Sequence, residues 1–152
     1  GDIAKWWGEN ISEDWFNIRS EVYGILQRED TLKEIVRLLG PEALPDEEKL
    51  ILEVARMIKI GLLQQNSFDD VDTYCSPEKQ FKLMKLLVDF YKQGQQAIKE
   101  GTPLSDIRAM SSITSILKAR MDIKDDEMPK LDQLSTDMGK EFKSITGVKV
   151  SN

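Results

Sequence analysis

Residues 32–63 decide the fold of this 152-residue chain, and they read LKEIVRLLGPEALPDEEKLILEVARMIKIGLL. On both sides of a central turn, apolar residues recur at intervals of three and four, which is the spacing of a helix with one buried face. Gly40 and Pro41 end the first helix, because glycine tolerates positive φ and proline cannot continue the helical hydrogen bonds. Pro45 suits the first turn of the second helix, and the acidic residues after it favour the positive end of the helix dipole. The stretch therefore predicts a helical hairpin with a stiff, charged turn.

The same helical spacing extends in both directions from this hairpin. Upstream it runs back to Ser12, although Gly24 and the polar residues after it leave open whether this segment is one bent helix or two. Downstream, Ser76 and the proline after it start another helix, and apolar periodicity predicts further helices over 104–117 and 128–145. We therefore expect an all-α bundle of about five to six helices, with the charged hairpin turn projecting at one end.

Composition excludes several classes of function. The chain has 21 basic and 27 acidic residues, a net charge of −6 and a pI near 4.8, so its surface opposes binding to nucleic acid. It has no histidine, which excludes Ser-His-Asp and Cys-His catalysis and histidine zinc sites. No apolar run is long enough to predict a membrane-spanning helix. The sequence also lacks the glycine patterns that hold nucleotide phosphates, since Gly139-Lys140 is followed by glutamate rather than Ser or Thr.

Two features could suggest a metal site or a reactive thiol, and each has a simpler explanation. Asp69, Asp70 and Asp72 offer the oxygens that calcium prefers, but the later positions of an EF-hand loop are not matched, so turn chemistry is favoured. Cys75 is the only cysteine, and a single cysteine is more often a small buried apolar residue than a nucleophile. We predict no metal ligands and no catalytic residue in this chain.

Two other stretches suggest contact with a partner. Trp6 and Trp7 are adjacent and cannot share one face of a helix or strand, so one of them is expected to meet something outside this domain. The turn Gly40–Lys49 is either a solvated connection or a rigid projection that touches a partner. Prolines stiffen it, and we expect the apolar side chains of Ala43 and Leu44 to be exposed there.

Five blocks of sequence occur together in this chain: ILQRE at 25–29, LKEIVRLLG at 32–40, LP at 44–45, QQNSFD at 64–69 and VDTYC at 71–75. Between about Trp7 and Met121 they resemble the C-terminal helical domain of the catalytic A subunit of archaeal and vacuolar-type rotary ATPases. The first two blocks also resemble the beta subunit of F-type ATP synthases. The last two separate the catalytic subunit from the non-catalytic B subunit of the same complexes.

The resemblance implies that this chain is one part of a larger subunit. Residues 1–11 would then be a junction from a nucleotide-binding domain, residues 12–123 the helical bundle, and residues 124–152 a tail with a weakly amphipathic helix. The P-loop, the catalytic carboxylate and the magnesium ligand would lie upstream, so ATP or ADP with magnesium would bind in the parent enzyme and the isolated chain would not hydrolyse ATP. The implied partners are the upstream domain, the B subunits and the central-stalk rotor, in the cytoplasmic head of the complex and peripheral to the membrane.

The resemblance also gives the turn a role. Gly40–Lys49 occupies the place of the F-type DELSEED loop, which pushes on the rotating central stalk, and the implied contact residues are Glu42, Ala43, Leu44, Pro45, Asp46, Glu47 and Glu48. The acidic charge is rearranged here, and exposed ion pairs contribute only about 0–1 kcal/mol each. We therefore hypothesise that the turn transmits force through bulk and stiffness, so that replacing all three of its last acidic residues with alanine leaves rotation coupled.

A second role falls on the block at 64–69, which resembles the segment that closes over the adenine ring. Phe68 could stack on the base, and Gln65 or Asn66 could bond its edge, whereas Ser67 replaces the alanine usual in the family. The alternative is that Phe68 only fills the space between helix ends. We expect no measurable ATP affinity in the isolated chain, because the phosphate cradle supplies most of the binding.

A different class of function also fits a helical chain without visible catalytic groups. A freestanding adaptor or scaffold could bind partner helices in its grooves. The sequence of the gene upstream of Gly1 would distinguish the two, since only the first hypothesis expects a P-loop domain there.

Overall fold

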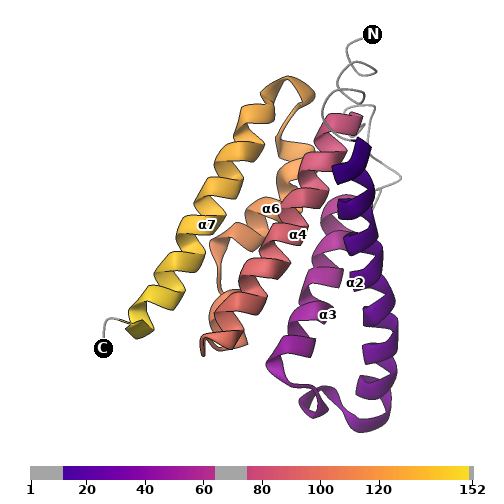
Figure 1. Cartoon of the computed structure of the whole chain (residues 1–152), viewed down its shortest axis with the longest axis vertical. Coiled ribbons are helices and arrows are strands. Elements are labelled where there is room, and N and C mark those ends of the chain that lie inside the picture. The colour runs from indigo at the N-terminus through magenta and orange to yellow at the C-terminus, as the bar shows by residue number, and fades with distance from the viewer. Residues whose placement is uncertain (1–11, 64–74, 151–152) are drawn as a thin grey trace.

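The computed structural model describes residues 12–63 and 75–150, and within these ranges the chain is an all-helical bundle, as predicted (Figure 1). The six α-helices are α2 (Ser12–Leu39), α3 (Asp46–Ile58), α4 (Pro77–Lys99), α5 (Leu104–Arg108), α6 (Ser111–Asp122) and α7 (Met128–Val150). Shorter turns are the 3₁₀ segments η1 (Pro41–Ala43) and η4 (Asp125–Glu127) and the π-helical segment η2 (Lys59–Leu63). Among these described helices, none is both long and apolar enough to cross a membrane.

Helix α4 is the central element of the bundle. It packs against α2, α3, α6 and α7. Figure 1 shows the hairpin of α2 and α3 on one side of α4 and α7 on the other, with the α2–α3 turn at the opposite end of the molecule from the start of α2. This turn extends beyond the ends of α4 and α7, so the predicted projection of the hairpin is confirmed.

Helix α2 is one helix and is not split at Gly24. A Cβ atom at Gly24 would meet no atom within 4 Å, so no close packing demands a break there. The polar run that follows contains Glu29, which is only 5% exposed. Its carboxylate lies 2.5 Å from the Lys59 ammonium and 3.6 Å from that of Lys33. The ion pair with Lys59, the first residue of η2, therefore compensates the buried charge in this polar run.

The predicted start of α4 is confirmed, whereas the single helix predicted over 104–117 is wrong. The Ser76 hydroxyl accepts a hydrogen bond from the backbone N–H of Lys79 at 3.2 Å and caps the first turn. Between α5 and α6, Met110 takes an extended conformation with φ −65° and ψ 132°, so the helix is interrupted. Met110 is buried, and the break lets its side chain enter the core.

A carboxylate from α7 caps the start of α6 after this break. Glu141 accepts hydrogen bonds from the backbone N–H and the hydroxyl of both Ser111 and Ser112, at 2.6–2.9 Å. Burial opposes the charge of Glu141, but these four bonds outweigh it and hold the pKa of the carboxyl below its ordinary value of 4.5. Phe142 follows and packs its ring 5.2 Å from that of Phe90 in α4. Residues of the predicted tail therefore lie against α4 and α6.

Helices α3 and α4 approach each other closely at a glycine. A Cβ atom at Gly94 would lie 3.0 and 3.2 Å from the two δ-carbons of Leu50, which is fully buried. The absence of a side chain at Gly94 therefore lets the two helices lie close together.

Candidate functional site

The projecting turn is built from a glycine conformation and a short 3₁₀ segment. Gly40 has φ 86° and ψ 160°, a region that is essentially restricted to glycine, and its N–H donates to the carbonyl of Val36 at 2.8 Å. The N–H groups of Ala43 and Leu44 then bond the carbonyls of Gly40 and Pro41. Gly40 has the predicted positive φ, although its ψ lies outside the left-handed helical region. Backbone hydrogen bonds thus fix the turn at Gly40 and across η1.

Leu44 does not lie on the surface of the turn, so the expectation of an exposed leucine is wrong. Its side chain is only 4% exposed and belongs to the hydrophobic core. The reason is geometric: the 3₁₀ segment turns the chain inward before Pro45 directs it into α3. Ala43 remains exposed. Leu44 therefore anchors the turn to the bundle.

The acidic residues of the turn have different surroundings. Glu42 is exposed, and its carboxylate pairs across the turn with Lys49 at 3.4 Å. Asp46 is half-buried and accepts a hydrogen bond from the backbone N–H of Leu104, at the start of α5, at 3.1 Å. Glu47 is exposed and Glu48 is half-buried. Asp46 thus differs from its two acidic neighbours, because its carboxylate is hydrogen-bonded to another helix.

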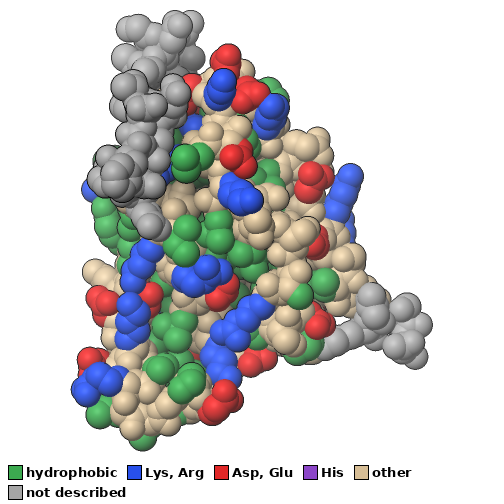
Figure 2. Space-filling view, turned by 180° about the vertical axis from the view of Figure 1, so that it is seen from behind, with side chains coloured by type: hydrophobic (Ala, Val, Ile, Leu, Met, Phe, Trp, Pro, Cys, Tyr) green, Lys and Arg blue, Asp and Glu red, His purple; other side chains and the backbone are tan. Residues whose placement is uncertain are grey.

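Two leucines at the end of α2 are the large exposed hydrophobic side chains of this tip. Leu38 is 69% exposed and Leu39 is 73% exposed, the largest fractions among the large hydrophobic side chains that are described. The lower end of the molecule accordingly shows hydrophobic side chains among charged ones (Figure 2). Leu39 follows Leu32 and Val36 at helical spacing, which predicts a buried side chain. It is exposed because the hairpin extends past the helices that would cover it. The helical period cannot show where the neighbouring helices end.

The four predicted adenine contacts, Gln65, Asn66, Ser67 and Phe68, lie outside the described residues, as do Trp6, Trp7 and the cluster Asp69, Asp70 and Asp72. The elements on either side of residues 64–74 are both tied to α6. The buried guanidinium of Arg120 donates to the carbonyl of Leu62 at 3.1 Å, and the buried ammonium of Lys79 donates to the carbonyl of Arg120 at 2.6 Å. These bonds bring the end of η2 and the start of α4 to the last turn of α6.

Cys75 is half-buried and packs against the core. Burial raises the pKa of its thiol to about 11, and the positive charge of Lys79 opposes this only in part. The thiol is therefore protonated at neutral pH, in agreement with a packing role.

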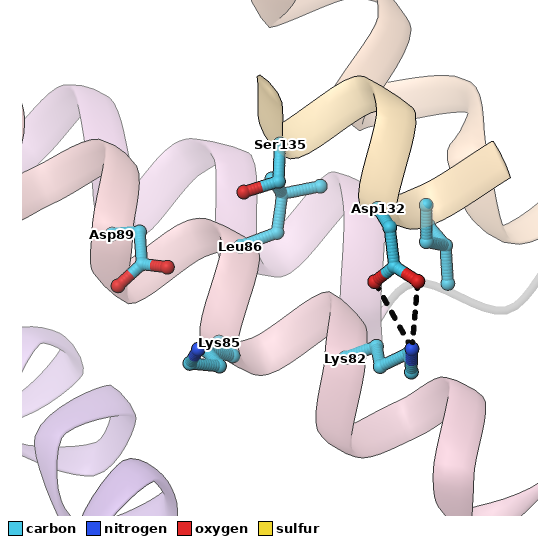
Figure 3. A pocket seen from close by; sticks show the side chains of 7 residues that line it. Lys82, Lys85, Leu86, Asp89, Asp132 and Ser135 are labelled. Atoms are coloured by element: carbon cyan, nitrogen blue, oxygen red, sulfur yellow. Dashed lines mark hydrogen bonds and ion pairs between the residues drawn. The ribbon is translucent and has the colours of Figure 1, made fainter. Parts of the chain in front are cut away.

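A small cavity of about 70 Å³ lies between α4 and α7 and is lined by side chains of both helices (Figure 3). Charges of both signs line it, and Figure 3 shows the Lys82 ammonium bonded to both oxygens of Asp132, at 3.0 and 3.2 Å. Burial raises the pKa of Asp89 on the same wall, against the opposing effect of Lys85 and Lys92. The pair between Lys82 and Asp132 joins the two helices. Over residues 12–63 and 75–150 as a whole, no group of three acidic or cysteine side chains is placed to hold a metal ion.

Comparison with known proteins gives a consistent result. A family model described as the C-terminal domain of V and A type ATP synthase matches residues 4–108. The A subunit of the A-type ATP synthase from Ignicoccus hospitalis is 46% identical over 134 residues, which are 87% of this chain and 22% of that protein. The same protein from Hyperthermus butylicus is 46% identical over 90% of this chain and 23% of its own length. The A subunit from Methanopyrus kandleri is 41% identical over 95% of this chain and 24% of its own length. The chain thus spans less than a quarter of the length of these relatives.

Proposed function

Because the chain belongs to the family of C-terminal domains of V and A type ATP synthases, we propose that it is the mechanical coupling module of the catalytic subunit of a rotary ATP synthase. In this proposal, nucleotide binding in the preceding part of the subunit moves the bundle, and the hairpin tip presses on the central stalk. Rotation of the stalk then drives ion transport, and the motion runs in reverse during ATP synthesis.

The observation that carries the proposal is the position of the hairpin tip. It lies at the opposite end of the molecule from the start of α2, so a force applied near the start of α2 reaches the tip along the helix axes (Figure 1). Helix α2 has 28 residues and, at 1.5 Å per residue, is about 42 Å long. Close-packed interiors transmit displacement rather than absorb it. The bundle is therefore suited to act as a stiff lever.

The composition of the tip supports contact with another protein. Leu38 and Leu39 present apolar side chains to solvent at a place where the fold does not need them. The single ion pair that the structure describes on the turn joins exposed Glu42 to half-buried Lys49, so it lies within the turn itself. Large apolar side chains thus lie at the tip beside the charged ones, which agrees with transmission by steric contact.

The nucleotide would act from outside the described residues. The sequence has no P-loop, and within residues 12–63 and 75–150 no group of acidic or cysteine side chains is placed to hold a metal ion. The proposal retains adenine contact by Gln65, Asn66, Ser67 and Phe68, with ATP or ADP and magnesium held by the upstream domain. It also includes the B subunits as neighbours and a place in the cytoplasmic head, peripheral to the membrane.

Site-directed cross-linking in an assembled complex tests the position of the tip. With Cys75→Ser as background, Glu42→Cys places a thiol on the tip and Asp126→Cys places one at the far end, and both native side chains are exposed. We expect a short photoactivatable cross-linker to join the Glu42→Cys variant to the central stalk, whereas the Asp126→Cys variant should not form this product. A labelled Glu42→Cys variant that gives no product with the stalk, or equal products from both positions, would refute the proposal.

A further inference from the structure

We propose that Asp46 is a positioning residue that locks the projecting hairpin to the corner between α4 and α5. The inference rests on the proposed function, in which the hairpin tip bears load. It adds a path by which that load enters the second half of the bundle.

The geometry places one carboxylate between two helix starts. Asp46 is the first residue of α3, and its Oδ2 atom accepts a hydrogen bond from the backbone N–H of Leu104, the first residue of α5, at 3.1 Å. The first N–H groups of a helix have no partner within that helix, so this bond satisfies a donor that the fold would otherwise leave without one. Leu104 is itself buried, at 3% exposed. The acceptor is charged, and such bonds are about twice as strong as neutral ones.

A second contact gives the two helices a common alignment. Glu53 lies two turns after Asp46 on α3, and its carboxylate is 4.0 Å from the guanidinium of Arg108 at the end of α5. The same glutamate pairs more closely with Arg56, at 2.6 Å. Because Arg108 is half exposed, its pair with Glu53 contributes little. Asp46 is therefore the stronger of the two links from α3 to α5.

The other acidic residues of the turn are not equivalent to Asp46. Glu47 is exposed, and across residues 12–63 and 75–150 no hydrogen bond or ion pair joins the carboxylate of Glu47 or Glu48 to another side chain. A variant in which all three are alanine would therefore remove a structural bond together with two surface charges. The steric hypothesis is better tested by separating them.

Amide hydrogen exchange in the 152-residue chain tests the bond itself. Asp46→Ala should accelerate exchange of the Leu104 amide by about 10-fold or more, because a bond to a charged acceptor is lost. Asp46→Asn should largely retain protection, since its amide oxygen still accepts a hydrogen bond. Glu47→Ala is the matched control and should leave the Leu104 amide unchanged. Equal protection of this amide in Asp46→Ala and wild type would overturn the proposal.

Coupling in the assembled complex tests the role. We expect Asp46→Ala to reduce the ions transported per ATP hydrolysed while the KM for ATP stays unchanged. The Asp46→Asn variant and the control Asp126→Ala, at the far end of the molecule, should both remain coupled. Full coupling in Asp46→Ala, with the tip cross-link to the stalk still formed, would refute the positioning role and leave the proposed function intact. If Asp46→Ala does not assemble, Asp46→Asn decides: normal coupling supports the lock, and lost coupling overturns it.

Discussion

Two leucines near the hairpin turn test which side chains of the tip stabilise the bundle and which are free to contact a partner. Leu44 is 4% exposed and Leu39 is 73% exposed, although only the turn separates them in the sequence. We expect Leu44→Ala to destabilise the chain and Leu39→Ala to leave its stability unchanged. The pair is matched because both substitutions remove the same three carbon atoms.

The magnitude follows from burial. Three carbon atoms at about 0.8 kcal/mol each give about 2.4 kcal/mol for loss of transfer free energy at Leu44. The cavity left behind adds to this, although a site at the end of the bundle can collapse more readily than a central one, so we expect a total of about 3 kcal/mol. For a chain of this size, that loss lowers the Tm by about 6–12 °C. Leu39→Ala should change the unfolding free energy by less than about 0.5 kcal/mol.

Urea unfolding followed by circular dichroism measures both free energies on the purified chain. In the assembled complex, the yield of the cross-link from Glu42→Cys to the stalk is measured instead. We expect Leu39→Ala to lower this yield although it leaves the stability of the protein unchanged. The reasoning would be wrong if Leu39→Ala cost as much stability as Leu44→Ala, because exposure would then not distinguish the two positions.

Two further predictions concern the packing between helices. Gly94→Ala should destabilise the chain by about 1 kcal/mol, since overpacking against buried Leu50 outweighs the gain in helix propensity. Gly139→Ala should stabilise it by about 0.5–1 kcal/mol, because the new methyl group meets no atom closer than 3.9 Å. A thermal melt in which Gly94→Ala is the more stable variant would contradict this. Glu141→Gln should cost about 1–3 kcal/mol near neutral pH, because an amide cannot accept all four bonds from the start of α6. Folding lowers the pKa of Glu141, so its contribution is present above the unfolded pKa near 4.5 and is lost as the pH falls through the lower folded pKa. Melts at a series of pH values should therefore show the two proteins converging in acid, and a difference that persists there would argue against the carboxylate cap.

Features that depend on neighbouring residues could be predicted without coordinates. Gly40 and Pro41 end α2, and Ser76 with the proline after it starts α4, because caps and breakers act within one helical turn. The helical period likewise indicated the all-α class. The blocks at 25–40 and 64–75 carried the resemblance that the family match then supported, because local sequence preserves a family pattern whether or not the contacts are known.

The partners of individual side chains, in contrast, emerged from the packing of the bundle. Leu39 lies on the apolar stripe but is exposed, and Leu44 lies in the turn but is buried. Asp46 bonds the start of α5, and Glu141 caps the start of α6 across 29 or 30 residues of sequence. Such outcomes depend on where each helix ends in space relative to helices that are distant in the sequence. A local sequence pattern carries no information about these relative positions.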